Sequence, residues 1–349
     1  MSDLRHTILA IRPLDHRAME KAQIRQNNLA KPQGSLGRLE KLSVKLSGIK
    51  GELPRLEHKA IITMVADHGV TAQGVSAHPS EITTQMVYAL LEGGGAICML
   101  ARQVGAKLIL VDMGVASDLI PNPKLISKKI AHGTCDISEG PAMTRDEAER
   151  SIEAGIDIIE AECSRGLDIV GTGDMGIGNT TPSSAICSSI TGQPVIEITG
   201  MGAGLDKEGV AHKVEIIERA LETNKPDPKD PIDVLAKVGG FEIGGLAGVI
   251  LGAAANRVPI VIDGFVSGAA ALIAVGLAPR TREYIIASHI SAEPGHTAII
   301  DHLRMEPLLD LGMRLGEGTG AALGIFLAEA ASRTLTGIWT FDEMLKIER

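Results

Sequence analysis

One carboxylate, Glu317, lies in a glycine-rich run near the C-terminal end of the chain, Leu-Gly-Met-Arg-Leu-Gly-Glu-Gly-Thr-Gly, residues 311–320. Apolar side chains precede it, and apolar surroundings remove water from an acid and raise its pKa. A carboxylate with a raised pKa is suited to accept a proton near neutral pH, as a general base does. The same position is equally typical of a residue that caps a helix starting near Gly318, so the pattern leaves both interpretations open.

Five loops predicted to follow strands are rich in glycine and polar side chains: residues 67–71, 171–181, 200–206, 263–268 and 288–296. Glycine lets a backbone approach a phosphate closely, and the amides at the start of a following helix supply donors and a positive dipole. In an open parallel sheet, ligands bind beyond the carboxyl ends of the strands, where such loops meet. The loops therefore predict a phosphorylated small ligand.

The second of these loops matches a dinucleotide-binding pattern, G-x-G-x-x-G, at Gly171, Gly173 and Gly176, with Glu197 at a suitable distance for a ribose contact. Glycine-rich turns are also frequent in α/β proteins without a dinucleotide, so the pattern is weak. The polar run at residues 179–184 follows, with a proline near the first helical turn. This run favours a helix start that faces a ligand.

Lys213 follows the third glycine-rich loop and could place an ammonium beside a phosphate. Its position alone favours a solvated lysine on a helix, because exposed lysines are the rule. The loop histidines His68, His78, His289 and His296 lack metal-ligand spacing, and we expect no metal and no cofactor. The sequence also contains no nucleophile elbow with a plausible triad and no P-loop.

Composition excludes several other classes of protein. The chain has 349 residues, a net charge of −9 and only four Phe, two Tyr and one Trp, so we expect no nucleic-acid partner. The four widely spaced cysteines lie in apolar stretches and are predicted to be reduced structural thiols. No secretory signal is recognisable, and charged residues interrupt the most apolar region, residues 243–278. We therefore expect a soluble, cytoplasmic protein that contacts no membrane.

The elements that must position these residues follow a βαβ pattern from residue 59 onward. Six strand-like runs predict an α/β fold with a doubly wound, mostly parallel sheet. They lie at residues 61–66, 108–112, 168–171, 195–198, 259–262 and 284–288. A capping box at Thr144 and Glu147 predicts a helix that follows. We predict a small helical domain formed by residues 1–58 and 318–349, beside a large domain of residues 59–317. The C-terminal segment includes a helix from Thr340 to Ile347.

Taken together, the chain resembles the nicotinate-nucleotide–dimethylbenzimidazole phosphoribosyltransferases. The resemblance covers nearly the whole chain and is carried by the motifs at residues 31–40, 66–70, 176–182, 239–243, 263–265, 288–291 and 316–320. It implies a Rossmann-like six-stranded sheet, a small helical domain from both chain ends, and a homodimeric enzyme. The implied reaction moves phosphoribose from nicotinate mononucleotide to 5,6-dimethylbenzimidazole and releases nicotinate.

The same resemblance implies roles for individual residues. Glu317 is the base that deprotonates the benzimidazole nitrogen. Phosphate and ribose contacts fall to Gly176, Asn179, Thr180, Lys213 and Ser291. The benzimidazole pocket falls near Ser80 and Leu315, and we expect further substrate contacts at Gly202, Asp263 and Gly318.

Position 174 departs from the family pattern, because Asp174 stands where the motif has Glu. A contact made directly by the longer side chain can here pass through water, so Asp174 is a substrate-binding candidate whose role the sequence leaves open. Two other functions stay open at this point. The run Gly-Thr-Gly-Asp, residues 171–174, also occurs in ribokinase-type kinases, and a non-catalytic nucleotide- or azole-binding protein would need the same loops.

Overall fold

The computed structural model describes residues 3–346, and its centre is one six-stranded parallel sheet. The strand order is β3-β2-β1-β4-β5-β6, the order of the doubly wound dinucleotide-binding fold. The predicted sheet is therefore confirmed. Its strands are β1 (Lys59–Ala66), β2 (Ala106–Gly114), β3 (Leu125–Ser127), β4 (Ile169–Met175), β5 (Ile260–Ile262) and β6 (Ile285–Ala287).

One predicted strand is wrong, and one strand of the six-stranded sheet was not predicted, nor was the small pair β7–β8. Residues 195–198 form a short helix, α8 (Val195–Ile198), which Pro194 precedes. Its apolar side chains Val195 and Ile198 are buried, while Ile196 and Glu197 are exposed. The sixth strand is instead β3, a three-residue edge strand that pairs only with β2 among the described residues.

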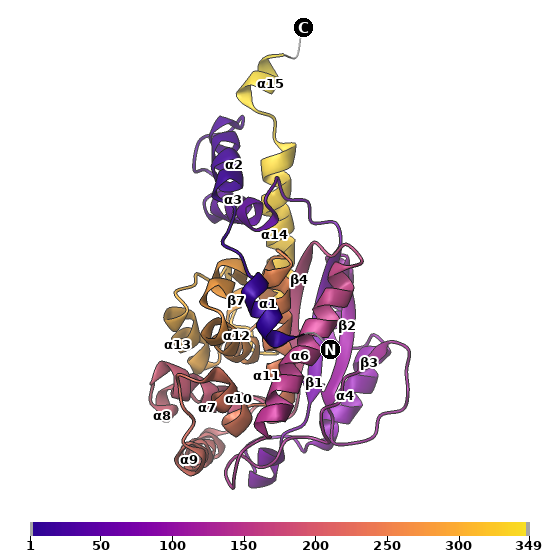
Figure 1. Ribbon diagram of the computed structural model, residues 1–349, viewed down its shortest axis with the longest axis vertical. Helices are drawn as coiled ribbons and strands as arrows, with labels where there is room; N and C mark the ends of the chain where they lie inside the picture. The colour runs from indigo at the N-terminus through magenta and orange to yellow at the C-terminus, as the bar shows by residue number, and fades with distance from the viewer. Residues whose placement is uncertain (1–2, 347–349) are drawn as a thin grey trace.

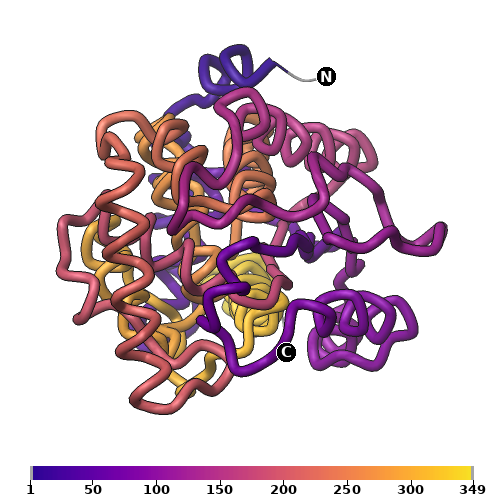
Figure 2. Tube along the Cα trace, turned by 90° about the horizontal axis from the view of Figure 1, so that it is seen from below, coloured from indigo at the N-terminus to yellow at the C-terminus, as the bar shows by residue number. Residues whose placement is uncertain are grey.

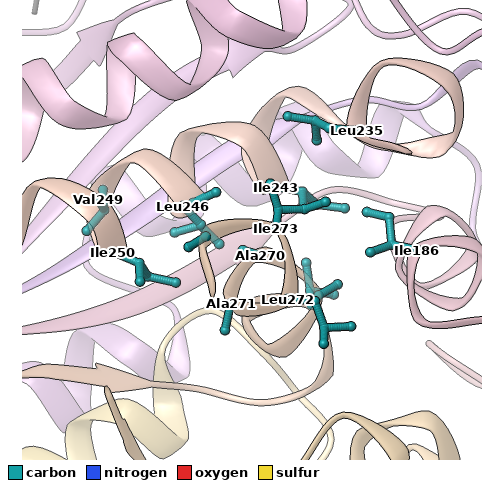
Figure 3. Packing of buried hydrophobic residues seen from close by; sticks show 14 of the residues in the cluster. Ile186, Leu235, Ile243, Leu246, Val249, Ile250, Ala270, Ala271, Leu272 and Ile273 are labelled. Carbon is teal, nitrogen blue, oxygen red and sulfur yellow. The ribbon is translucent and has the colours of Figure 1, made fainter. Parts of the chain in front are cut away.

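Helices cover both faces of the sheet, as a doubly wound fold requires. One face carries α6 (Arg145–Cys163), α11 (Phe241–Ala255) and α12 (Phe265–Leu277), and the other carries α4 (Glu81–Leu91), α5 (Ala96–Gln103) and α14 (Thr319–Gly337). The core is built mainly of Ile, Leu, Val and Ala. Figure 3 shows this packing where Leu246 and Ile250 of α11 lie near Ala270 and Ile273 of α12.

The capping box at Thr144 is present, and the helix predicted after it is α6. Four further helices surround the carboxyl ends of β4 and β5 or pack beside them: α7 (Thr180–Thr191), α9 (Lys207–Asn224), α10 (Pro231–Val238) and α13 (Pro294–His302). Two 3-10 helices, η1 (Gly69–Gln73) and η2 (Pro279–Tyr284), and a small parallel pair, β7 (His289–Ile290) with β8 (Leu309–Asp310), complete the loops.

The two chain ends lie together. Helix α2 (His16–Asn28) packs on α3 (Arg38–Lys50), which packs on α14, and a bridge joins Leu29 to Thr340 just before α15 (Phe341–Leu345). Figure 1 shows α15 extending beyond the body next to α2, and Figure 2 shows α1 (Leu4–Ala10) at the edge of the molecule. The predicted helix end at Ile347 lies outside the described residues, and the domain boundaries at 58 and 317 stay a prediction.

The apolar segments are mostly interior. Helices α11 and α12, which span the most apolar part of the sequence, are almost wholly buried in the core. One helical stretch, Glu81–Gln103, is long and apolar enough to cross a membrane by length and composition alone, which is weak evidence, and residues 92–95 divide it into α4 and α5. All four cysteines are free, as predicted, although Cys135 is exposed rather than in apolar surroundings.

Candidate active site

A cavity of about 570 Å³ opens beyond the carboxyl end of β4, beside β1, where the strand order reverses direction. This is the place where a doubly wound sheet binds its ligands. The cavity collects residues from the segment after β1, from the β4–α7 turn, and from the loops before α9 and α14: Val75, Ser76, His78, Ile82, Met86, Asp174, Met175, Gly176, Ile177, Gly178, Asn179, Thr180, Gly202, Ala203, Arg314, Leu315 and Glu317.

The backbone of Glu317 is held in an unusual conformation. Its φ is +63°, a left-handed value that a residue with a side chain rarely adopts. Its amide donates to the Asp174 carbonyl at 3.0 Å, and its carbonyl accepts the Thr63 hydroxyl at 2.9 Å. Gly173 allows this approach, because a Cβ there would lie 2.3 Å from the Glu317 carbonyl oxygen. Strands β1 and β4 thus fix the turn that carries Glu317.

The Glu317 side chain is buried at the cavity wall, with 4% of its surface exposed. Burial raises the pKa of this carboxyl, while the Ile97 amide at the start of α5 opposes the rise. Its Oε2 atom has no hydrogen-bond partner among the described residues. The interpretation of Glu317 as a helix cap is wrong, because the N-cap residue of α14 is Gly318, which has no side chain.

A second buried carboxyl group, Asp174, lies beside Glu317 at the end of β4. Asn179 donates to its Oδ2 at 3.0 Å. Burial raises the pKa of Asp174 well above its usual range, and the nearby carboxylates of Asp263, Glu242 and Glu317 raise it further. Asp174 lines the cavity, so its carboxyl group is available to a ligand there.

Two cations, Lys213 and Arg314, lie near Thr180 and Gly202, together with the buried carboxylate of Glu293. Lys213 is fully buried, and its Nζ donates to the Thr180 hydroxyl at 2.6 Å. Burial lowers the pKa of Lys213 to about 8. The interpretation of Lys213 as a solvated lysine is wrong, because α9 turns this side chain inward against the start of α7. Arg314 lies close by and donates to the Gly202 carbonyl at 2.6 Å.

The structure brings together most of the predicted site residues, but not all. Asp174, Gly176, Asn179, Thr180, Gly202, Leu315 and Glu317 line the cavity, and Lys213 reaches it through Thr180. Four predicted contacts do not line it: Ser80, Asp263, Ser291 and Gly318. Asp263 is fully buried, and both of its carboxylate oxygens accept backbone amides of the α14 start.

Sequence reasoning missed the cation Arg314 and the apolar wall formed by Val75, Ile82 and Met86. An arginine within the glycine-rich loop of Glu317 was a usable signal, because that loop already pointed to the site. The apolar wall had no such signal, since its residues come from α4 and the loop before it and their role depends on tertiary packing.

The interpretation of residues 171–176 as a dinucleotide-binding turn, with Glu197 as its ribose contact, is wrong. Gly171 and Gly173 lie inside β4 and not in a turn, and Glu197 is an exposed residue of α8.

No group of three or more His, Cys, Asp or Glu side chains within residues 3–346 could hold a metal ion. His68 instead forms a buried pair with Glu242, with Nε2 and Oε1 3.0 Å apart.

A cavity at the switch point of a parallel sheet, with a buried acid on one wall and a lysine at a glycine-rich helix start, is typical of an enzyme that acts on a phosphorylated small molecule. The comparisons define the class further. The chain belongs to the phosphoribosyltransferase family whose model, described as "Phosphoribosyltransferase", matches residues 11–344.

Relatives carry a more specific name. The nicotinate-nucleotide–dimethylbenzimidazole phosphoribosyltransferases of Desulforudis audaxviator (strain MP104C) and Roseiflexus sp. (strain RS-1) are 59% and 58% identical over 344 residues, 98% of this chain and 98% of theirs. The crystal structure of CobT from Thermus thermophilus matches with a TM-score of 0.91 and 39% identity, over 94% of this chain and 98% of that chain. Membership in this family sets aside the kinase and binding-protein interpretations.

Proposed function

We propose that this phosphoribosyltransferase moves phosphoribose from nicotinate mononucleotide to 5,6-dimethylbenzimidazole, giving α-ribazole 5′-phosphate and nicotinate. The relatives that match over almost the whole chain are named for these two substrates. The observation that carries the proposal is the buried, unpartnered Oε2 of Glu317 at the wall of the cavity, within the part of the chain that the structure describes. A carboxylate in this position is available to accept a proton from an incoming azole.

In this mechanism the phosphate lies at the start of α7, near the positive end of its dipole, and Lys213 and Arg314 offset its charge. The acceptor lies on the apolar wall, with its N–H toward Glu317. One acceptor nitrogen attacks C1′ while the bond from C1′ to the pyridinium nitrogen breaks, and that electron pair neutralises the leaving ring. The proton of the acceptor passes to Glu317. In-line attack inverts C1′ and gives the α-linked product.

This reaction needs no acid at the leaving group, because nicotinate departs from a cationic nitrogen. It also needs no cofactor. Positioning lowers the barrier instead, since a fixed phosphate and ribose place C1′ between the two rings. Asp174 lines the cavity beside Glu317, and we propose that it contacts the ribose.

The test of the base is Glu317→Gln. The amide keeps the shape of the side chain but cannot accept the proton, so we expect a rate loss on the order of 10²–10⁴-fold. Binding of nicotinate mononucleotide, measured by calorimetry, should be retained. The exposed Glu197→Gln is the matched control and should leave the rate unchanged. Undiminished turnover of the Glu317 variant would contradict the proposed role.

The acceptor is tested separately. Purified protein is incubated with nicotinate mononucleotide and a panel of bases that includes 5,6-dimethylbenzimidazole, benzimidazole, adenine and a phenol. We expect the α-linked nucleotide of 5,6-dimethylbenzimidazole to form fastest, identified by mass and by the anomeric proton signal. A different preferred base would keep the transferase mechanism and replace the acceptor.

We further infer that the enzyme is a cytoplasmic homodimer that binds neither nucleic acid nor membrane. The net charge of −9 argues against a polyanion partner. Support for a dimer comes from exposed apolar side chains on α2 and on the segment from Trp339 through α15: Ile24, Trp339, Phe341, Met344 and Leu345. Exposed aromatic side chains in one region are typical of a protein interface.

A further inference from the structure

Asp263 follows β5 directly and faces the start of α14. Its Oδ2 accepts the Gly318 amide at 2.9 Å, and its Oδ1 accepts the amides of Gly320 and Ala321 at 2.7 and 3.2 Å. These three donors flank Glu317 on the C-terminal side. The first amides of a helix have no partner within the helix, and Gly318 offers no side chain to cap them. Asp263, which follows β5, therefore caps α14 in place of an N-cap side chain.

The surroundings of Asp263 are closed. The side chain is fully buried and does not line the cavity. His289 Nδ1 lies 4.0 Å from Oδ1, and the Ser288 hydroxyl donates to the Asp263 carbonyl at 3.2 Å. The Asp263 amide in turn donates to the Thr172 hydroxyl at 3.2 Å. The residue is thus fixed by β4, by the segment after β6 and by α14.

The close approach of these elements depends on glycine. A Cβ at Gly320 would lie 2.0 Å from His289 Nδ1 and 2.7 Å from Asp263 Oδ1. Gly318 has φ of +101°, next to the left-handed Glu317. A left-handed residue with a side chain costs about 1–3 kcal/mol and persists only where its neighbours impose it. Contacts on both sides of Glu317 impose this left-handed conformation. Asp174 and Thr63 bind its backbone, and Asp263 binds the amides that follow it.

We propose that Asp263 is a positioning residue for Glu317, and that its carboxylate holds the α14 start so that the Glu317 carboxylate stays at the cavity wall. This rests on the proposed function of Glu317 as the base. It replaces the expectation that Asp263 contacts substrate. The ionised form is the one that accepts three amides, and these bonds oppose the effect of burial, which raises the pKa of Asp263 to about 7.

The test is Asp263→Asn, which keeps the size of the side chain but leaves one acceptor oxygen for three amides. We expect kcat to fall on the order of 10²-fold, as for a catalytic group that is misplaced by about 1 Å. The KM for nicotinate mononucleotide should not change, because Asp263 does not touch the cavity. Hydrogen exchange at Gly318, Gly320 and Ala321 should become faster, and this readout does not depend on activity.

A double-mutant cycle separates positioning from other roles. If Asp263 acts through Glu317, adding Asp263→Asn to Glu317→Gln should lower kcat no further. Equal losses in both backgrounds, or a raised KM with unchanged kcat, would overturn the proposal. An inactive wild-type protein would instead contradict the proposed function. Faster hydrogen exchange at the three amides in Asp263→Asn would still show that Asp263 holds the α14 start.

Asp230→Asn is the matched control, because Asp230 caps α10 in a similar way but does not line the cavity. It should lower the melting temperature without changing kcat. If Asp263→Asn does not fold, Asp263→Glu replaces it, since it keeps the carboxylate but moves its oxygens relative to the three amides. The same cycle with Glu317→Gln then decides the outcome.

Discussion

At the scale of single residues, the clearest physical feature is the buried ammonium of Lys213. Removing a charge from water is costly, and the compensation that the described residues provide is the Thr180 hydroxyl, the Gly200 carbonyl and the charge of Glu293. A bound phosphate would offset this cost further. Under the proposed function, Lys213 lowers the stability of the empty protein and raises its affinity for the phosphate, a pattern common in binding sites.

The pH dependence follows from the lowered pKa of Lys213, about 8 in the folded chain against 10.5 for an ordinary lysine. Between these two pKa values the unfolded chain binds more protons than the folded chain, so the free energy of unfolding rises with pH. Below about pH 8 the full cost of burying the charged ammonium is present. Lys213→Met should raise the unfolding free energy at pH 7 by about 1–3 kcal/mol and weaken binding of nicotinate mononucleotide. Denaturant titration and calorimetry measure the two effects.

Lys45 provides the control for this prediction. Burial lowers its pKa to about 8 as well, but it donates to the Ile285 carbonyl at the sheet edge and does not line the cavity. Lys45→Met should leave nucleotide binding unchanged. Equal loss of binding in both variants would contradict a phosphate role for Lys213. The sequence could not distinguish the two lysines, because only the packing of α9 against α7 buries one of them at the site.

At the scale of elements, α6 and α11 pack so closely that their backbones touch. A Cβ at Gly155 would lie 1.9 Å from the Gly245 carbonyl oxygen, and one at Gly248 would lie 1.9 Å from the Ile152 carbonyl oxygen. A backbone carbonyl cannot move aside as a flexible side chain can. The glycines of α11 therefore set the spacing of this helix pair against the sheet, and they explain why so apolar a helix contains so much glycine.

Gly155→Ala should accordingly lower the unfolding free energy by about 2–3 kcal/mol, because overpacking outweighs the better helix propensity of alanine. Gly337→Ala is the control, since Gly337 is an exposed residue of α14 with nothing within 4 Å of the added Cβ. That change should be neutral or stabilise the protein by up to about 1 kcal/mol. Chemical denaturation of both variants measures the difference, and equal stability would contradict the packing argument.

Elements also show where sequence patterns fail. The run Val-Ile-Glu-Ile at residues 195–198 has the composition of a strand, but Pro194 starts a helical turn and no strand within residues 3–346 pairs with it. Strand β3 has only three residues and exists because β2 offers it a free edge. The other five strand-like runs were long or apolar enough to predict correctly. These errors, and the unpredicted pair β7–β8, all concern short segments whose structure depends on neighbours.

At the scale of the whole molecule, the order of glycine-rich loops and apolar runs was enough to predict the parallel sheet and the place of its ligand site. The orientation of buried polar groups was not predictable, because Asp263 and Gly318 are 55 positions apart and only the fold brings the α14 start against β5. The same limit applies to the partner surface. Its residues come from the two ends of the chain, which only the fold brings side by side.

That surface supports the last prediction. Arg25 and Glu343 form an ion pair of 3.6 Å, and Ala30 donates to the Trp339 carbonyl at 2.8 Å, so the segment from Trp339 through α15 lies beside α2. Trp339 is the one tryptophan of the sequence and is about half exposed in the single chain. If a second copy covers this surface, its fluorescence should shift to longer wavelength on dilution, and light scattering should report a dimer at higher concentration.

Trp339→Glu should convert that dimer to a monomer, because burying an unpaired carboxylate in an apolar interface costs several kcal/mol. Leu9→Glu is the control, since Leu9 is a comparably exposed apolar residue on α1, away from α15 (Figure 1). It should leave the mass unchanged. A wild-type protein that scatters as a monomer at all concentrations, or a Trp339 variant that stays dimeric, would show that copies of the chain do not associate through this end of the molecule.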